Sequence, residues 1–304
     1  MQIKSTIVLA FVMGSLLAGC GNYDYKKTKD GLLYKIVHNG KGETIKPGEY
    51  LKVYISNSIH DSILNSNYGH IAAYGMFDTT AKNNYSFIDF LGEMKVGDSA
   101  IFLQSVDTLQ KKGILQYSPV FKPGTTITGT VKILKVLKNE ADVNADYIAD
   151  MDAEKNREIA GLEAFLKDNK ITNASKTSGG VFVVVEQQGT GLQADSGMQV
   201  SVKYTGYLKN GKKFDSNTDS SFQHVQPYEF VVGTKSVIPG WDEGIKLFKE
   251  GGKGKIYVPA MLAYGQQSQG EKMPAFSDLI FDIELISVHV PDQVRQAGPP
   301  PLPH

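Results

Sequence analysis

The sequence has almost no cysteine and no excess of charge of either sign. Cys20 is the only cysteine in 304 residues, which excludes a disulfide framework. Lysine plus arginine equals aspartate plus glutamate at 32 each, so no global field attracts nucleic acid and we expect no nucleic-acid partner. The six histidines show no ligand-type spacing, and we therefore expect neither a metal site nor a cofactor.

A long apolar run is also missing. The run from Ile7 to Met13 is shorter than the ~20 residues of a membrane-spanning helix, and its position after Lys4 is typical of a cleaved export signal. Small residues then lead to Cys20, a pattern that resembles a bacterial lipobox. The resemblance implies a lipid anchor on Cys20 and, with Gly21 next, an outer-membrane location facing the periplasm or the cell surface. An ordinary secretory signal with an incidental cysteine is the alternative.

One β-rich pattern occurs twice in the chain. Gly31, Gly40, Gly42 and Gly48 are followed 149 residues later by Gly180, Gly189, Gly191 and Gly197. Strand-like runs flank these glycines at 32–37 and 50–55 in the first copy, and at 181–185 and 198–204 in the second. Glycines that stay in register without a gap indicate two copies of one domain.

Between the copies the composition shifts to glutamate, aspartate, alanine and lysine. Ile159, Leu162, Phe165 and Leu166 recur at helical spacing, and Asn169 can help to end a helix. These features predict an amphipathic linker helix. Its apolar stripe is expected to pack on one of the domains, with a homodimer through the stripe as the alternative.

The second copy contains the only tryptophan of the chain, Trp241. Pro239 suits the first position of a helix, and Trp241, Ile245 and Phe248 then share one helical face. Alternating strands place four further rings on one face of a sheet, at Tyr204, Phe214, Tyr228 and Phe281. The helix is expected to cover this face, so that Trp241 is either an ordinary core residue or the floor of an apolar pocket.

Five runs of the second copy carry a family resemblance. They are Val202-Lys203-Tyr204-Thr205-Gly206, Gly211-Lys212-Lys213-Phe214-Asp215-Ser216, Val237-Ile238-Pro239-Gly240-Trp241, Ala263-Tyr264-Gly265 and Phe281-Asp282-Ile283-Glu284-Leu285. In order and spacing they resemble the FK506-binding protein family of peptidyl-prolyl isomerases. The resemblance implies an α+β fold with two such domains, each an antiparallel sheet wrapped on a short helix, joined by a helical linker.

The same resemblance implies an enzyme that isomerises X-Pro bonds and assists the folding of exported proteins, with proline-containing polypeptides as clients. The positions it assigns to catalysis are Tyr204, Asp215, Ile238, Trp241, Tyr264 and Phe281. The positions it assigns to substrate binding are Phe214, Tyr228 and Val237. Trp241 would floor the pocket, with the Ile238 N–H and the Tyr264 hydroxyl as donors to the substrate. The chain departs from the family near Ser220, where many members carry an arginine that pairs with the aspartate. A non-catalytic chaperone or binding protein that uses the same pocket is the alternative.

The first copy lacks several of these positions. Ile55 stands at the position of the strand tyrosine and Gly129 at that of the last phenylalanine, while Phe77-Asp78 echo the Phe-Asp pair. Residues 90–94 run directly into a turn, so we expect the helix with its tryptophan to be lost here. The first copy is therefore predicted to be degenerate, without a prolyl pocket, and to act as a spacer, a dimerisation surface or a client-holding module.

These observations predict the order of segments along the chain. They are a signal peptide (1–19), a tether (20–29), a degenerate domain (30–138), a helical linker (139–174), an isomerase domain (175–291) and a disordered Pro-rich tail (292–304).

Overall fold

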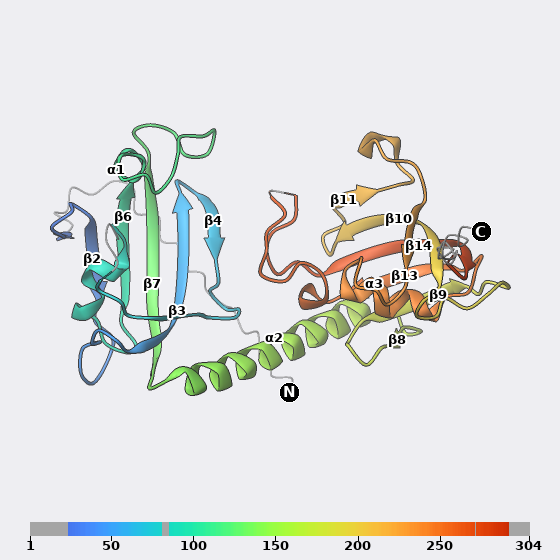
Figure 1. Ribbon diagram of the computed structural model, residues 1–304, viewed down its shortest axis with the longest axis horizontal. Coiled ribbons are helices and arrows are strands. Elements are labelled where there is room, and N and C mark those ends of the chain that lie inside the picture. The colour runs from blue at the N-terminus through green and yellow to red at the C-terminus, as the bar shows by residue number, and fades with distance from the viewer. Residues whose placement is uncertain (1–23, 81–84, 271, 292–304) are drawn as a thin grey trace, which may run out of the picture. The chain divides into compact units, whose positions relative to one another are not determined.

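The computed structural model describes residues 24–80, 85–270 and 272–291 (Figure 1). The predicted signal peptide, Cys20 and the Pro-rich tail lie outside them. Contacts between residues divide the chain into two compact units. The first comprises the residues up to Ser66 together with Met76–Val136, and the second comprises Asn67–Gly75 together with the residues from Leu137 onward. Across the described ranges, no helix combines the length and the apolar character needed to cross a bilayer.

The first unit is built on a seven-stranded antiparallel sheet, which also contains a strand from the expected tether. Lys26 and Lys27 pair with Tyr34 and Leu33, so this part of the expected tether belongs to the sheet. Six of the strands follow in the order β1 (Lys26–Lys27), β2 (Leu33–Val37), β6 (Ser99–Ser105), β7 (Thr126–Leu137), β3 (Tyr50–Ile59) and β4 (Ser62–Ser66). The seventh strand of the sheet is β5 (Ala73–Met76), of which the division by contacts assigns only Met76 to the first unit. One α-helix, α1 (Val106–Lys111), follows β6.

A short helix is present in the first unit, so the expectation that it is lost is wrong. The 3-10 helix η1 (Phe87–Glu93) begins at a capping box: the Ser86 hydroxyl accepts the N–H of Ile88, and the Asp89 carboxylate accepts the N–H of Ser86. Such a box satisfies backbone N–H groups that the first turn leaves without partners. Phe90 and Leu91 of this helix are buried, so both units have a sheet packed on a short helix.

The hydrogen bonds of the two copies correct one predicted correspondence. The N–H of Gly48 donates to the carbonyl of Phe77 at 2.8 Å, and the N–H of Gly197 donates to the carbonyl of Val232 at 2.8 Å. Because Gly48 and Gly197 are a registered pair of the repeat, Phe77 corresponds to Val232. The expected match between Phe77-Asp78 and the Phe-Asp pair of the second copy is therefore wrong.

The second unit has a sheet of the same kind, again with seven antiparallel strands. Their order is β11 (Lys213–Ser216), β10 (Gln199–Leu208), β14 (Leu279–His289), β13 (Lys253–Val258), β9 (Phe182–Gln187) and β8 (Ser175–Lys176), with β12 (Tyr228–Val231) paired to the first half of β10. The short helical turns are η2 (Ser220–Phe222), α3 (Pro239–Gly244), η3 (Ile245–Leu247) and η4 (Ala260–Leu262).

Helix α3 lies directly on strand β13. A Cβ atom added at Gly240 would come within 2.2 Å of the Val258 side chain, and one at Gly244 within 2.8 Å of Ile256. Only glycine permits this close approach of a helix to a strand. Trp241 and Ile245, at 5% and 0% exposed, are consequently held against the sheet in the core of the unit.

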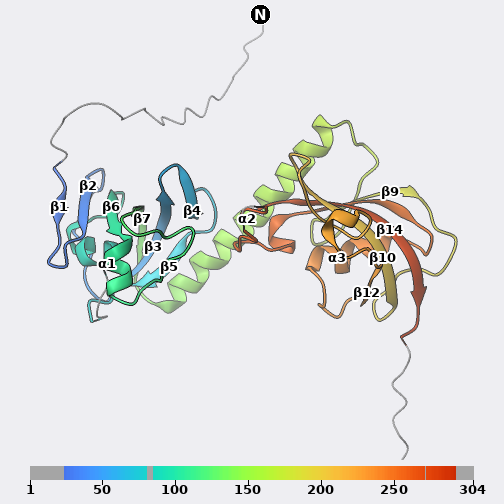
Figure 2. The ribbon, with the colours of Figure 1, turned by 90° about the horizontal axis from the view of Figure 1, so that it is seen from above.

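The linker helix α2 (Glu140–Asp168) packs on the opposite face of the same sheet, and Figure 2 shows it as one continuous helix. Its Leu162 and Leu166 join a second core cluster with Phe182, Val184 and Tyr257. Strand β9 is therefore buried on both faces, which explains its unbroken apolar run. The apolar stripe predicted for this helix therefore packs on the sheet of the second unit.

Glu158 is a buried acid on α2, at 8% exposed. One carboxylate oxygen accepts the N–H of Met261 at 2.9 Å, while the other has no hydrogen-bond partner. Burial raises the pKa of Glu158 to about 8; the Met261 N–H opposes this rise, and the carboxylates of Asp278 and Glu154 add to it. The folded protein thus keeps a proton on Glu158 that the unfolded chain releases.

We expect Glu158→Gln to make the second unit more stable at neutral pH. The unfolded carboxyl titrates near 4.5 and the folded one near 8, so the free energy of unfolding falls as pH rises between these values. At 1.36 kcal/mol per pKa unit the loss reaches up to about 3 kcal/mol by pH 7. Glutamine has no proton to lose, and its amide can donate to Glu154. Denaturation followed by Trp241 fluorescence at pH 5, 6, 7 and 8 measures this difference, and identical pH slopes for both proteins would contradict it.

Candidate functional site

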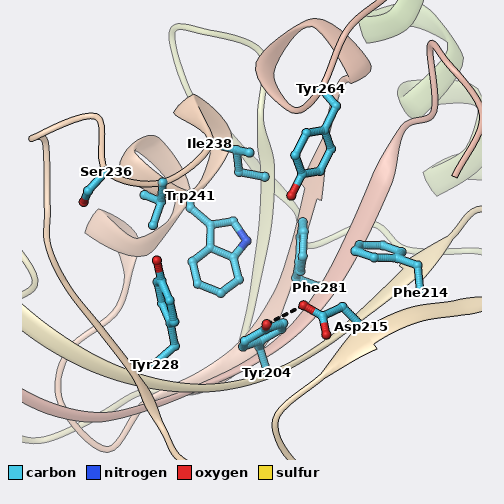
Figure 3. Close-up of a pocket in the computed structure, with 10 residues that line it drawn as sticks. Tyr204, Phe214, Asp215, Tyr228, Ser236, Ile238, Trp241, Tyr264 and Phe281 are labelled. Atoms are coloured by element: carbon cyan, nitrogen blue, oxygen red, sulfur yellow. Dashed lines mark hydrogen bonds between the residues drawn. The ribbon is translucent and has the colours of Figure 1, made fainter. Parts of the chain in front are cut away.

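The second unit contains an open pocket of about 360 Å³ on the side of the sheet that carries α3 (Figure 3). All nine residues predicted for catalysis or substrate binding line it, and the structure adds Ser236. No pattern in the sequence singled out Ser236, which directly precedes Val237 on the loop into α3. The lining residues are Tyr204, Phe214, Asp215, Tyr228, Ser236, Val237, Ile238, Trp241, Tyr264 and Phe281.

Trp241 forms the floor of the pocket, and other rings stand on edge around it (Figure 3). Tyr204 and Phe281 meet the indole at centroid distances of 5.0 Å and 5.2 Å, with interplanar angles of 82° and 83°. Phe214 meets Phe281 in the same way at 5.7 Å and 87°. Edge-to-face contact suits the charge distribution of aromatic rings. The indole Nε1 is buried and has no hydrogen-bond partner among the described residues, so the floor combines an apolar ring with one unpaired N–H donor.

Asp242 ties the pocket loop to α3. Its carboxylate accepts the N–H of Gly233 at 2.8 Å and that of Lys235 at 3.1 Å. Both donors belong to the loop that leads from β12 to Val237 and Ile238, and Asp242 itself is only 9% exposed. Hydrogen bonds to a carboxylate acceptor are among the stronger ones in proteins. They fix the loop that forms one wall of the pocket.

Polar groups lie at the rim of the pocket. The Tyr204 hydroxyl donates to Asp215 Oδ2 at 2.6 Å, and His224 Nε2 lies 2.7 Å from Asp215 Oδ1. Burial, and then the nearby Asp215, raises the pKa of Tyr204 well above its usual range; burial followed by Asp215 also raises the pKa of Tyr264. Both phenols therefore keep their protons at neutral pH and can donate hydrogen bonds.

The pocket offers a substrate apolar rings, phenol hydroxyls and one carboxylate. Within the described ranges, no group of three or more histidine, cysteine, aspartate or glutamate residues is arranged to hold a metal ion. The geometry suits the enclosure of a small apolar ring over Trp241 while donors at the rim hold the attached peptide. His224, which pairs with Asp215, was not identified from the sequence; the only signal was the missing arginine near Ser220.

The first unit has a helix at the position of α3 but a different aromatic residue at the position of Trp241. In the first copy the Ile45 N–H donates to the carbonyl of Met94, and in the second the Ala194 N–H donates to the carbonyl of Phe248. Ile45 and Ala194 are 149 residues apart, which is the spacing of the repeat, so Met94 corresponds to Phe248. Seven residues before them stand Phe87 in the first copy and Trp241 in the second. Phenylalanine thus occupies the position of the floor tryptophan.

The carboxylate is also replaced in the first unit. Asp215 lies opposite Gly206 in the β10–β11 pairing, and Asn65 lies opposite Asn57 in the β3–β4 pairing. Since Asn57 matches Gly206 in the repeat, Asn65 is the counterpart of Asp215. Its side-chain oxygen accepts a hydrogen bond from Asn57 at 2.9 Å, so the position is neutral and occupied.

A core ring fills the space of Phe281 in the first unit. Gly129 lies opposite Phe102, as Phe281 lies opposite Ile256 in the second unit. A Cβ atom at Gly129 would come within 2.1 Å of the Phe102 ring, which therefore covers this glycine. Phe102 also contacts Phe87 and Phe90 at centroid distances of 6.0 Å and 6.1 Å. The pattern of rings that surrounds the pocket is thus not reproduced.

Comparison with known proteins places residues 191–286 in the FKBP-type peptidyl-prolyl cis-trans isomerase model. An FK506-binding protein of Neisseria meningitidis serogroup B is 41% identical over 111 residues, which are 36% of this chain and 98% of that protein. The FKBP-type isomerase FkpA of Aeromonas hydrophila is 38% identical over 163 residues, 53% of this chain and 58% of that protein, so the match spans little more than half of its length. The crystal structure of FkpA from Escherichia coli shares 35% identity over 50% of this chain and 68% of that chain, with a TM-score of 0.37.

Proposed function

Because this chain belongs to the family of FKBP-type peptidyl-prolyl cis-trans isomerases, we propose that its second unit isomerises X-Pro bonds of exported polypeptides in the pocket floored by Trp241. One observation carries the proposal: nine positions scattered between Tyr204 and Phe281 meet around one cavity of about 360 Å³. Its open, apolar interior matches the size and character of a prolyl ring with its flanking peptide.

The proposed chemistry is desolvation of the twisted amide. Resonance keeps a peptide bond planar, and the barrier to rotation is ~18–20 kcal/mol. A bond turned by a quarter loses resonance and polarity, so a dry aromatic site favours the twisted form over either planar isomer. If the pocket lowered the barrier by about 5 kcal/mol, the rate would rise between a thousandfold and ten-thousandfold, at 1.36 kcal/mol per decade.

Rim donors would hold the peptide while the bond turns. The Tyr264 hydroxyl faces the pocket interior, and Ile238 brings its backbone to the pocket wall just before α3 (Figure 3). In this proposal the Ile238 N–H and the Tyr264 hydroxyl donate to substrate carbonyls on either side of the proline. Asp215 orients Tyr204, whose ring lies nearly perpendicular to the indole ring of Trp241.

The test compares Asp215→Ala with its counterpart in the first unit, Asn65→Ala. We expect Asp215→Ala to lower kcat/KM for an X-Pro peptide about tenfold, because Tyr204 loses its hydrogen-bond acceptor and the wall of the pocket loosens. Asn65→Ala should leave catalysis unchanged. A protease-free isomerisation assay on the full chain measures both variants. Equal rates for the wild type and Asp215→Ala would oppose the proposed role of this residue.

We further propose that the protein is a lipoprotein of the outer membrane, on its periplasmic or outer surface. The support is the sequence: small residues precede Cys20, and several acyl chains at about 0.8 kcal/mol per buried methylene anchor stably. Cys20→Ser should abolish labelling by a fatty-acid analogue in a bacterial host, whereas persistent label would exclude this anchor. Leu162 and Leu166 of the α2 stripe pack within the chain, and a homodimer stays a prediction.

A further inference from the structure

His224 lies at the edge of the pocket, next to the carboxylate that holds Tyr204. Its Nε2 is 2.7 Å from Asp215 Oδ1, while the Tyr204 hydroxyl donates to Oδ2 at 2.6 Å. The two oxygens of Asp215 are thus held from different sides by different segments of the chain. The side chains of His224 and Asp215 are 49% and 36% exposed, so the pair is in contact with solvent and can exchange protons with it.

The local backbone brings His224 to this position. The turn η2 begins at Asp219, whose carboxylate accepts the N–H of Ser221, and ends at Gln223 in the left-handed conformation with φ of 63°. A residue other than glycine rarely adopts this conformation. His224 follows Gln223 directly, and its imidazole lies against Asp215.

The other titratable groups around this pair do not replace His224. Tyr204 and Tyr264 are neutral phenols near neutral pH, because burial raises the pKa of each. Tyr228 lines the same pocket with a further phenol ring. Lys213 is bound to Asp219 at 2.6 Å, and the Lys272 ammonium lies 5.9 Å from the centre of the Phe222 ring. Among the residues that the structure describes, the ion pair recorded for Asp215 is the one with His224.

We propose that His224 is a positioning residue: when protonated, it holds Asp215 in place, and Asp215 in turn holds the Tyr204 ring that lines the pocket. Isomerisation therefore slows as the histidine loses its charge. The inference rests on the proposed function of the pocket. A protonated imidazole gives Asp215 Oδ1 a charged donor, which is stronger than a neutral one. Histidine is the side chain that ordinarily changes charge between pH 5 and 8. The other polar contacts of Asp215, the Tyr204 hydroxyl on Oδ2 at 2.6 Å and the Ser216 N–H on Oδ1 at 2.9 Å, persist through this range.

The test is the pH profile of kcat/KM for an X-Pro peptide, measured with the full chain between pH 5.5 and 8.5. For the wild type we expect a fall of about two- to fivefold, the range typical of one exposed ion pair. His224→Gln should give a flat profile at the level that the wild type reaches at high pH. His224→Lys, which keeps its charge, should retain the higher level at pH 8.5. A flat wild-type profile, or an unchanged slope in His224→Gln, would overturn the proposal.

A second readout separates this proposal from the proposed function. The ring proton signals of His224 are compared by NMR at pH 6 in the wild type and in Asp215→Ala. We expect these signals to move in the variant, because the imidazole loses the carboxylate that lies 2.7 Å from its Nε2. Unmoved signals would overturn the pairing, even if catalysis is normal. A wild type that catalyses at no pH, with signals that move as expected, would instead overturn the isomerase function and leave the pairing in place.

Discussion

Trp241→Ala is expected to lower both the stability of the second unit and its isomerase activity. The indole is 5% exposed and touches Tyr204 and Phe281, and truncating a buried tryptophan costs about 3–5 kcal/mol. In the proposed mechanism the pocket also loses its floor, so water would enter the space that encloses the twisted amide. We expect kcat/KM to fall about 10- to 100-fold, which corresponds to ~1.4–2.7 kcal/mol of barrier.

The control for this variant is Phe248→Ala. Phe248 is fully buried in the same core but does not line the pocket. It should cost a similar 3–5 kcal/mol in urea denaturation while the folded variant keeps a kcat/KM near that of the wild type. Both proteins are assayed where denaturation curves show them folded. If the two variants lost activity in proportion to stability alone, Trp241 would be a core residue without a role in catalysis.

Phe102→Ala is expected to destabilise the first unit by about 3–5 kcal/mol and to leave catalysis unchanged. The ring is 2% exposed, covers Gly129 and contacts Phe87 and Phe90, so its removal leaves a cavity at the centre of that sheet. Hydrogen exchange of the β6 and β7 amides reports on this loss. The expected result is faster exchange in the first unit with unaltered Trp241 fluorescence and kcat/KM.

The matched comparison is Ile256→Ala in the second unit, at the position that corresponds to Phe102. Ile256 is fully buried and lies under α3, so the same truncation there should weaken the support of the pocket. A loss of catalysis in Phe102→Ala as large as that in Ile256→Ala would show that the first unit takes part in the reaction. That outcome would contradict the assignment of the site to the second unit.

Much of the second unit is predictable because its signals are local. Alternating strands, the proline at the start of α3 and the glycines that allow close packing each follow from short-range rules. These rules predict that Trp241 and the rings opposite it share one face. They do not predict His224, because its approach to Asp215 depends on the left-handed conformation of Gln223, which the sequence around it does not signal.

Two expectations for the first unit are wrong, and each has a physical reason. Phe77-Asp78 has the same residue types as Phe214-Asp215 of the pocket. The hydrogen bond from the Gly48 N–H to the Phe77 carbonyl nevertheless shows that Phe77 corresponds to Val232. Sequence spacing alone cannot decide register when loops differ in length. The helix η1 was missed because its capping box, from Ser86 to Asp89, was not recognised in the run that precedes Phe90.

Catalysis by the wild-type full chain tests the central claim most directly. Exchange between the cis and trans forms of an X-Pro peptide is measured by NMR with catalytic amounts of wild type and, in parallel, of folded Trp241→Ala. We predict exchange accelerated by orders of magnitude with the wild type and at least about tenfold less with the variant. Peptide binding without faster exchange, or equal exchange with both proteins, would contradict the claim; the first result would identify a binding protein that uses the same pocket.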